Sequence, residues 1–339
     1  MQRYLKQYKE ARKGSKGYLE LVWAKAEAQA DFGEADILEG GVRKTIKYLT
    51  LSFPYSNAGF SQCFGGESSE CVCQGLKDIF SHIGGVPLRI VVDNGTGIGR
   101  RIQDKVSYSE LFLRFKCHYG FSVSFCNVNA GHEKGNVENK IGYTRRNFFV
   151  PMPEVESVDG FNEELFRRAE EDHEREHYKK SLFISELFEE ERKAFGSLPV
   201  RPFNVERFER VSADGYGKFC VDGKHWYSSA PEYGNSQLIV GLKARELVVY
   251  RPDGNELCTH ARVYGEERTD SSDYRTSLDR LLKKPGAWSN SVFRSQVTEE
   301  VRQAMDRLSK PELKTVLQVF KDSSAHFGFE VAMVSLEEA

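Results

Sequence analysis

Three acidic residues stand where an α/β fold could gather them into one pocket. Asp31 lies on the polar side of the alternating stretch 27–34, Asp93 ends the apolar run 88–92, and Glu138 begins a helical pattern. Ligands in α/β proteins gather at the carboxyl ends of such strands. Carboxylates that meet without basic partners repel one another, and the ligand that suits them is a hard divalent cation, above all Mg²⁺. We therefore predict that Asp31, Asp93 and Glu138 bind two Mg²⁺ or Mn²⁺ ions about 4 Å apart. Such a pair of ions could activate an attacking oxygen and stabilise a leaving one.

Each of these acids also has an ordinary structural interpretation. Asp93 opens an Asp-Asn-Gly turn signal. Glu138 could be an acidic residue that the dipole of its helix favours near the N-terminus. Asp31 could be a solvated strand residue. The order of the surrounding elements favours the acidic triad over three separate coincidences.

Basic and aromatic residues accompany the triad. Lys134 and Arg145 share a broad helix face with Glu138, and Lys140, Tyr143 and Arg146 flank that face. Cations beside a metal-binding carboxylate site suit the phosphate backbone of DNA. The alternative is a solvated helix face. Two further candidates for DNA contacts, Arg100 and Arg101, follow Asp93 in the next loop.

Other motifs in the chain indicate little. His173 and His177 match H-E-x-x-H, which would place two histidines one turn apart on a helix. That stretch is charged on every side and offers no dry pocket for a zinc ion, so we expect no zinc there. The glycine-rich segment 95–100 ends in Arg100, where a dinucleotide-binding loop needs its third glycine. No G-x-x-x-x-G-K-[ST] sequence is present, so we expect no ATP hydrolysis by this chain.

The elements that must position the triad follow from hydrophobic periodicity. Three strand-like stretches come first, and helices then alternate with two short apolar strands. This order predicts a mixed five-stranded sheet, an antiparallel meander extended by parallel strands, with helices on both faces. A long charged helical region, 161–195, follows. The predicted strands are 27–34, 42–53, 56–64, 88–92 and 122–126, and the helices are 67–82, 107–120 and 134–149.

The chain changes character after Leu198-Pro199. Short strands with regular turn signals predict a small closed β barrel over 203–266. We expect four regions: a basic helical linker (1–25), the catalytic core (26–198), the barrel (203–266) and a C-terminal helical region (267–339).

Composition fits a globular protein that works inside a cell. The 339 residues are 40% hydrophobic and 29% charged, and no apolar run approaches the roughly 18 residues of a spanning helix. The seven cysteines are odd in number and scattered, which favours a reducing cytoplasm. The net charge is −2, but 161–195 alone holds eleven acidic and seven basic residues, so the total charge does not exclude nucleic acid.

The motifs together resemble a known family. QADFGE, GGVPLRIVVDNGTG and GHEKGNVENKIGYTRRN, in this order, look like the catalytic core of istA-type insertion-sequence transposases. The resemblance continues through His177–Lys180, 186–191, His225–Ser228 and His260–Gly265, and so covers nearly the whole chain. It implies membership of the DDE superfamily of transposases and retroviral integrases, with an RNase H-like fold.

The resemblance implies a function and partners. We expect metal-dependent nicking at the ends of an element, followed by attack of the freed 3′-hydroxyl on target DNA. It also implies a homo-oligomer on DNA, a separate AAA+ ATPase helper, and a place at the bacterial nucleoid. Two alternatives are a metal-dependent nuclease on the same fold and an inactive DNA-binding remnant. Such transposases usually begin with a helix-turn-helix region of roughly one hundred residues, which we expect to be missing before Met1.

Overall fold

The chain divides into two compact units, Met1–Val205 and Glu206–Ala339. The computed structural model describes residues 22–93, 97–102, 105–126, 135–273, 277–327 and 329–337. Most of the predicted basic linker, 1–25, is therefore outside the described residues. The other predicted boundaries, at 198 and 267 among them, stay predictions. Hydrophobic clusters lie within each unit, and each unit is described by itself.

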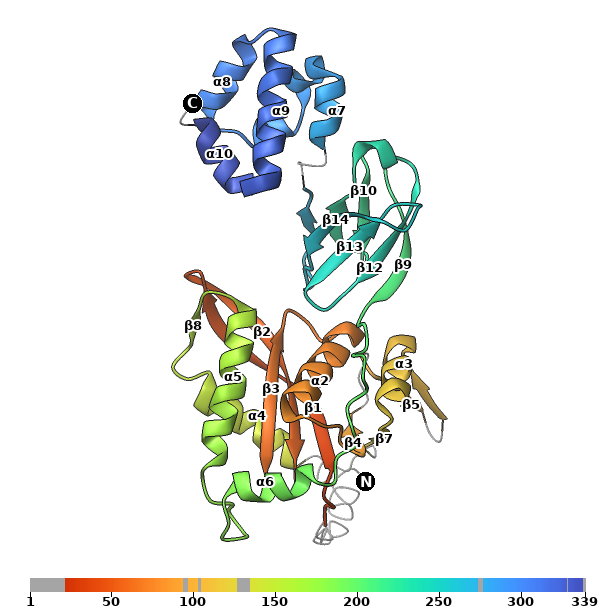
Figure 1. Ribbon diagram of the computed structural model, residues 1–339, viewed down its shortest axis with the longest axis vertical. Helices are drawn as coiled ribbons and strands as arrows, with labels where there is room; N and C mark the ends of the chain where they lie inside the picture. The colour runs from red at the N-terminus through yellow and green to blue at the C-terminus, as the bar shows by residue number, and fades with distance from the viewer. Residues whose placement is uncertain are drawn as a thin grey trace, which may run out of the picture. The chain divides into compact units, whose positions relative to one another are not determined.

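The first unit is built on one mixed β-sheet (Figure 1). An antiparallel meander is extended by two strands parallel to the first, in the order β3-β2-β1-β4-β7, which confirms the predicted mixed five-stranded sheet. A short extra strand, β8, pairs with the far end of β1. The strands are β1 (Glu27–Glu39), β2 (Val42–Phe53), β3 (Ala58–Phe64), β4 (Arg89–Val92), β7 (Ser122–Phe125) and β8 (Glu154–Val155).

Helices cover both faces of this sheet, as predicted. Neighbouring residues of a strand point to opposite faces. Helix α2 packs on the face that carries Leu49, since an added Cβ at Gly75 would lie 2.8 Å from the Leu49 side chain. Helix α4 packs on the opposite face, where the hydroxyl of Tyr48, the residue next to Leu49, donates to the Ile141 carbonyl. The helices are α2 (Ser69–Ile83), α3 (Glu110–Tyr119), α4 (Gly135–Phe148), α5 (Val158–His173) and α6 (Ile184–Arg192).

Helix α5 protects the edge strand β3. The Asn162 amide nitrogen donates to the Cys63 carbonyl at 3.1 Å, and its Oδ1 accepts from the Cys63 N–H at 2.6 Å. A side chain thus satisfies backbone groups that an edge strand would otherwise present to another chain.

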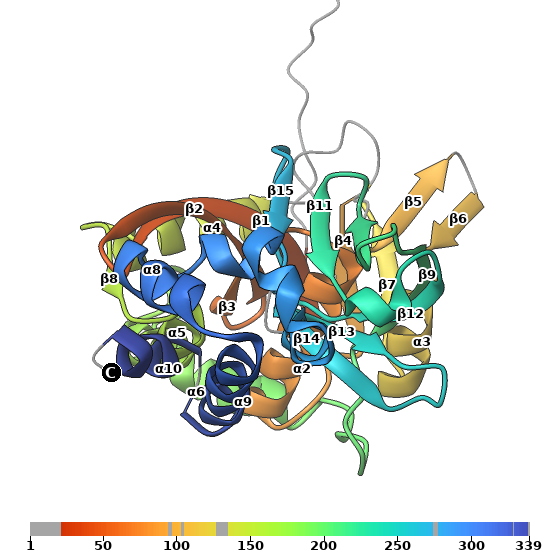
Figure 2. The same ribbon diagram turned by 90° about the horizontal axis from the view of Figure 1, so that it is seen from above.

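Two segments of the first unit differ from the prediction. The charged region 161–195 is not one helix, because α5 ends at His173 and α6 begins only at Ile184. A hairpin of β5 (Gly99–Ile102) and β6 (Lys105–Tyr108) also precedes α3, where the sequence indicated a loop and the start of a helix. Figure 2 shows this hairpin projecting away from the sheet.

The strands of the second unit form two sheets over one core instead of the closed barrel that the turn spacing predicted. Among the described residues, the sheets run in the orders β14-β13-β12-β9 and β10-β11-β15. Both sheets contribute to the core, from Val211 and Phe219 to Tyr227 and Val249. The strands are β9 (Arg207–Ser212), β10 (Lys218–Val221), β11 (His225–Ser228), β12 (Gln237–Leu242), β13 (Glu246–Tyr250), β14 (Glu256–Ala261) and β15 (Thr269–Ser271).

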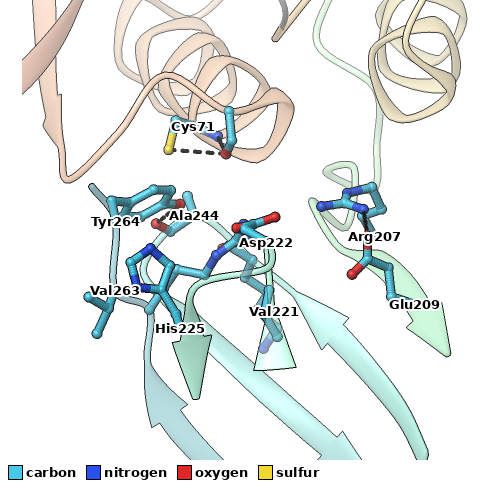
Figure 3. A network of polar contacts seen from close by, with 12 residues as sticks. Cys71, Arg207, Glu209, Val221, Asp222, His225, Ala244, Val263 and Tyr264 are labelled. Carbon is cyan, nitrogen blue, oxygen red and sulfur yellow. Dashed lines mark hydrogen bonds and ion pairs between the residues drawn. The ribbon is translucent and has the colours of Figure 1, made fainter. Parts of the chain in front are cut away.

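Hydrogen bonds join the loops between the strands of the second unit (Figure 3). The Tyr264 hydroxyl donates to the Ala244 carbonyl at 2.8 Å and so holds the segment after β14 against the β12–β13 turn. The buried Arg262 guanidinium bonds the Lys243 carbonyl and Asp222, each at 3.2 Å.

The C-terminal helices pack around a core of their own, within the helical region predicted over 267–339. Trp288 is buried in this core, and its indole N–H donates to Asp306 at 2.7 Å. None of the described helices combines the length and apolar composition needed to cross a bilayer. The helical elements are η2 (Pro231–Tyr233), α7 (Leu278–Lys283), η4 (Pro285–Asn290), η5 (Phe293–Ser295), α8 (Glu299–Arg307), α9 (Lys310–Phe327) and α10 (Phe329–Glu337).

Candidate active site

The register of β1 and β4 brings Asp31 and Asp93 to neighbouring positions. The parallel pairing of these strands ends at Ala30 opposite Val92, and the two aspartates are the next residues of each chain. Because side chains alternate along a strand, both lie on the face that Gln29 presents. Asp31 is half-buried and Asp93 is exposed. Two predicted carboxylates therefore lie at the carboxyl end of β4, where ligands of α/β sheets gather.

Helix α4 crosses the same face and carries Glu138 to it. The Gln29 side-chain oxygen accepts from the Val137 N–H at 2.9 Å, which holds the first turn of α4 on β1. Four residues along the strand, Gly33 has no side chain and lets α4 come close at Ile141. Asp31 lies between Gln29 and Gly33, and Glu138 lies in the turn of α4 that spans these contacts. The architecture thus places all three predicted acids on one side of the sheet.

Gly33→Ala should disturb this arrangement without touching a carboxylate. An added Cβ would lie 2.7 Å from Ile141 Cγ2 and closer still to the Tyr48 ring, so α4 must shift. We expect a loss of about 1–3 kcal/mol in the free energy of unfolding, as for other overpacked cores. Urea unfolding checks this. Gly196→Ala is the matched control, because its nearest neighbour would be an ordinary 3.6 Å away. Equal unfolding midpoints for the two variants would contradict the close approach.

The three carboxylates are not arranged as a complete metal-binding site. Among the described residues, no group of three or more His, Cys, Asp or Glu side chains is arranged to hold a metal ion. The Asp31 Oδ1 accepts from the Phe32 N–H at 3.0 Å, so one oxygen is engaged locally. The donor chemistry nevertheless suits Mg²⁺, since all three groups offer carboxylate oxygens and Glu138 is exposed. Metal binding by Asp31, Asp93 and Glu138 therefore stays a prediction.

The structure separates the basic candidates by exposure. Arg145 and Arg146 are exposed on α4, and Arg100 is exposed on β5. Tyr143 is half-buried and donates its hydroxyl to Asp172. Lys134 and the side chain of Arg101 are outside the described residues. The exposed arginines have the access that DNA contacts require.

Lys140 is buried, and a DNA contact by its ammonium group does not fit this position. Nζ donates to the Asn57 carbonyl in the β2–β3 turn at 2.6 Å, and the side chain runs past Gly59. Burial, and then the charge of Arg175, lower the pKa of Lys140 to about 8. Lys140 thus connects α4 to the β2–β3 turn through a buried hydrogen bond.

The two histidines of the H-E-x-x-H sequence lie on different elements. His173 is the last residue of α5, and His177 lies in the following loop. The His173 Nε2 accepts from the Gly59 N–H at 3.1 Å, and the His177 Nδ1 accepts from the Lys179 N–H at 3.0 Å. Burial, and then the charge of Lys140, lower the pKa of His173 to about 4. His173 is therefore a neutral core acceptor.

Glu191 is a buried carboxyl group that the sequence did not single out. Its Oε1 accepts from the Ala26 N–H at 3.2 Å, just before β1. Its Oε2 is buried without a hydrogen-bond partner among the described residues. Burial raises the pKa of Glu191 to about 7, although hydrogen bonds from Ser56 oppose the rise. Glu191 stands in a run of three glutamates, and only the fold distinguishes it from its neighbours.

Curated relatives of this chain are transposases. It is 27% identical over 290 residues to a transposase of Aminobacter aminovorans, which covers 81% of this chain and 55% of that protein. It is 25% identical over 305 residues to the transposase for insertion sequences IS1326/IS1353 of Pseudomonas aeruginosa, covering 84% of this chain and 57% of that protein. The chain therefore spans about half the length of the curated relatives it matches. No family model matches it.

Solved structures of integrases are also similar. The HTLV-2 integrase catalytic core in complex with magnesium aligns with a TM-score of 0.35 and 15% identity, over 49% of this chain and 97% of that one. A chain of the simian T-cell lymphotropic virus intasome, solved in complex with PP2A regulatory subunit B56 gamma, aligns over 74% of this chain and 83% of that one, with a TM-score of 0.37 and 12% identity. The sequence matches confirm the resemblance that the motifs indicated: this chain is a relative of the transposases of bacterial insertion sequences.

Proposed function

We propose that this chain is the catalytic part of a DDE-type DNA transposase. It would nick DNA at the ends of an element and join the freed 3′-hydroxyl to target DNA. The observation that carries this proposal is the placement of Asp31, Asp93 and Glu138 on one side of the sheet, in a relative of insertion-sequence transposases. Both steps are in-line displacements at phosphorus, so one site can serve both.

Asp31, Asp93 and Glu138 are the proposed ligands of two Mg²⁺ or Mn²⁺ ions. Three carboxylates on one face repel one another unless a cation lies between them. When bound, the metal supplies activation of the attacking oxygen and stabilisation of the leaving oxygen. In support of this, Asp31 lies on β1, Asp93 directly follows β4, and Glu138 lies on α4, which contacts of Gln29 and Lys140 hold against the sheet.

Arg145 and Arg146 are proposed to bind the DNA backbone beside these acids. Both are exposed on α4, the helix that carries Glu138. Guanidinium groups there neutralise phosphates and offset the repulsion between DNA and the carboxylates. Arg100 on the β5–β6 hairpin, with Arg101 and Lys134, completes the proposed DNA-binding set.

Arg145→Ala should weaken DNA binding in a salt-dependent way. If Arg145 neutralises one phosphate, the slope of log affinity against log salt should become shallower by about one unit. Fluorescence anisotropy with duplex DNA at several salt concentrations measures this slope. Arg43→Ala is the matched control, because Arg43 is an exposed arginine bound to Asp36 at the far end of the β1–β2 hairpin. An unchanged slope for Arg145→Ala would remove Arg145 from the DNA-binding set.

A strand-transfer assay tests the proposed function. The purified chain is mixed with Mg²⁺ or Mn²⁺ and labelled DNA from the flanks of its own coding region, both intact and pre-cut at the 3′ end. A transposase joins the pre-cut strand to a second duplex. A nuclease cuts and does not join, and an inactive remnant does neither with either metal. Either of these last two outcomes overturns the proposal.

Further parts of the proposal concern assembly. The resemblance to istA-type transposases implies a multimer on two DNA ends, so we propose a homo-oligomer on DNA. The same resemblance also implies a separate AAA+ ATPase, which would prepare target DNA. The complex would act in the bacterial cytoplasm at the nucleoid.

A further inference from the structure

The segment between α5 and α6 is a closed, ordered loop. This α5–α6 loop, residues 174–183, is drawn in green beside the two helices in Figure 1. Glu176 and Phe183 form an antiparallel bridge, and the His177 N–H donates to the Leu182 carbonyl at 2.8 Å. These bonds fix the backbone on both sides of a short tip, residues 177–181.

Two basic side chains fix the α5–α6 loop to the rest of the unit. The Arg175 guanidinium lies 4.9 Å from the centre of the Tyr143 ring on α4, and its Nε donates to Asp172 at 3.1 Å. The Lys180 Nζ donates to the Tyr55 carbonyl at 2.6 Å and lies 3.5 Å from the centre of the Tyr55 ring. The loop is thus held beside α4, the helix that carries Glu138 and the exposed arginines.

The tip presents an aromatic ring and a cation that are already ordered. Tyr178 is 69% exposed, and its ring stacks on the His177 imidazole at 4.7 Å. The exposed Lys179 places its ammonium 5.7 Å from the centre of the Tyr178 ring. Burial lowers the pKa of His177, as do the neighbouring cations, so His177 supports the ring as a neutral base. Ordering these groups in advance reduces the entropy lost on binding.

We propose that this tip is a second DNA contact of the catalytic unit, in which Tyr178 stacks on an unpaired base and Lys179 binds the adjoining phosphate. The inference rests on the proposed function. It assigns to the tip the binding of the single strand that is exposed where the duplex opens at the cut. An exposed aromatic ring beside a cation is the combination that binds single strands. Residues 177–181 hold two lysines and no carboxylate, so their charge complements a nucleic acid.

A protein partner is the competing occupant of this surface. Leu182 and Phe183 beside the tip are each 44% exposed, which would suit an apolar contact. They lie at the base of the loop, where Phe183 precedes the first turn of α6. The tip itself offers charge and a single ring, which favours DNA.

Tyr178→Ala tests the inference in the full chain. Fluorescence anisotropy is measured with a single-stranded oligonucleotide and with a duplex that has a frayed end. We expect Tyr178→Ala to weaken binding to both probes at least about fivefold, and Tyr178→Phe to bind like the parent, because the ring is what stacks. Tyr216→Ala is the matched control, since Tyr216 is 79% exposed in the other unit. Equal melting temperatures for all variants confirm that they are folded.

The outcomes distinguish this inference from the proposed function. If Arg145→Ala weakens duplex binding and Tyr178→Ala binds both probes like the parent, the inference is wrong and the proposed function stands. If the parent binds neither probe, both are wrong. If Tyr178→Ala changes self-association in sedimentation and leaves DNA affinity intact, the tip is a protein contact and the inference is overturned.

Discussion

Asp93→Asn should reduce DNA cleavage and strand joining by at least about a thousandfold while the chain stays folded. The amide keeps the shape of the side chain but removes one negative charge and one metal ligand. Charge stabilisation by a bound metal is worth several kcal/mol, and every 1.4 kcal/mol corresponds to a tenfold change in rate. DNA affinity should hold or rise slightly, because one repulsive charge next to the phosphates is gone. Strand transfer on pre-cut ends, beside anisotropy on the same DNA, measures both quantities.

The control for this prediction is a matched aspartate away from the site. Asp159 is an exposed residue in the first turn of α5, and Asp159→Asn should leave cleavage and joining unchanged. Electron paramagnetic resonance of Mn²⁺ supplies a readout that does not depend on activity. The parent should bind Mn²⁺ more tightly than Asp93→Asn does. Joining by Asp93→Asn at the parental rate would mean that Asp93 is only the first residue of a turn.

The central sheet was predictable because its signals are local. Apart from Arg89, the run 88–92 is apolar, and Ile90, Val91 and Val92 are buried, as in a strand covered on both faces. It forms β4 from Arg89 to Val92. A polar residue directly after such a run lies at the carboxyl end of the strand, which is why Asp93 could be identified as a candidate. Its neighbour in β1 followed from the meander, since only a parallel pairing with β4 sets Asp31 beside Asp93.

The environment of Lys140 could not be predicted in the same way. On the helical pattern it stands among polar residues, like Arg145 and Arg146. It is buried because Gly59, more than 80 positions earlier, leaves room for its side chain and Asn57 offers a carbonyl. Neither of these residues carries a local signal. Whether a basic residue of α4 is buried or exposed depends on which residues of the sheet pack against it.

The break between α5 and α6 shows the same limit. Residues 174–183 contain no glycine or proline, so the sequence offered no reason to end a helix there. The loop is stabilised by contacts across the unit, among them those of Lys180 with Tyr55. The second unit differs for a related reason: turn signals located its strands, and the pairing of those strands into two sheets depends on contacts far apart in the chain.

Glu191 and His173 should give the first unit two opposed pH dependences of stability. Glu191 has a pKa of about 7 in the folded chain and an ordinary value of 4.5. Between these values the folded state holds more protons than the unfolded state, so the free energy of unfolding falls as pH rises. His173 has a pKa of about 4 in the folded chain and an ordinary value of 6.5. Here the unfolded state holds more protons, so stability rises with pH between about 4 and 6.5.

The two effects offset each other in the parent between about pH 4.5 and 6.5, and single substitutions should separate them. Glu191→Gln keeps an acceptor for the Ala26 N–H and removes the titration, so its stability relative to the parent should increase as pH rises from 4.5 to 7. His173→Gln keeps an acceptor for the Gly59 N–H, and its relative stability should decrease as pH rises from 4 to 6.5. Each change spans up to about 3 kcal/mol, since a pKa unit is worth about 1.4 kcal/mol.

Urea unfolding of parent and variants, followed by circular dichroism from pH 4 to 8, measures these differences directly. The difference between each variant and the parent cancels the many exposed groups that titrate in all three proteins. The sign of each difference is the test, because burial shifts a carboxyl group and an imidazole in opposite directions. Differences that stay flat with pH would mean that water reaches Glu191 and His173. Slopes of equal sign would contradict the burial of one of these two groups. Because His173 accepts from Gly59, next to the β2–β3 turn to which Lys140 donates, such a result would also contradict the contacts that hold α4 on this turn.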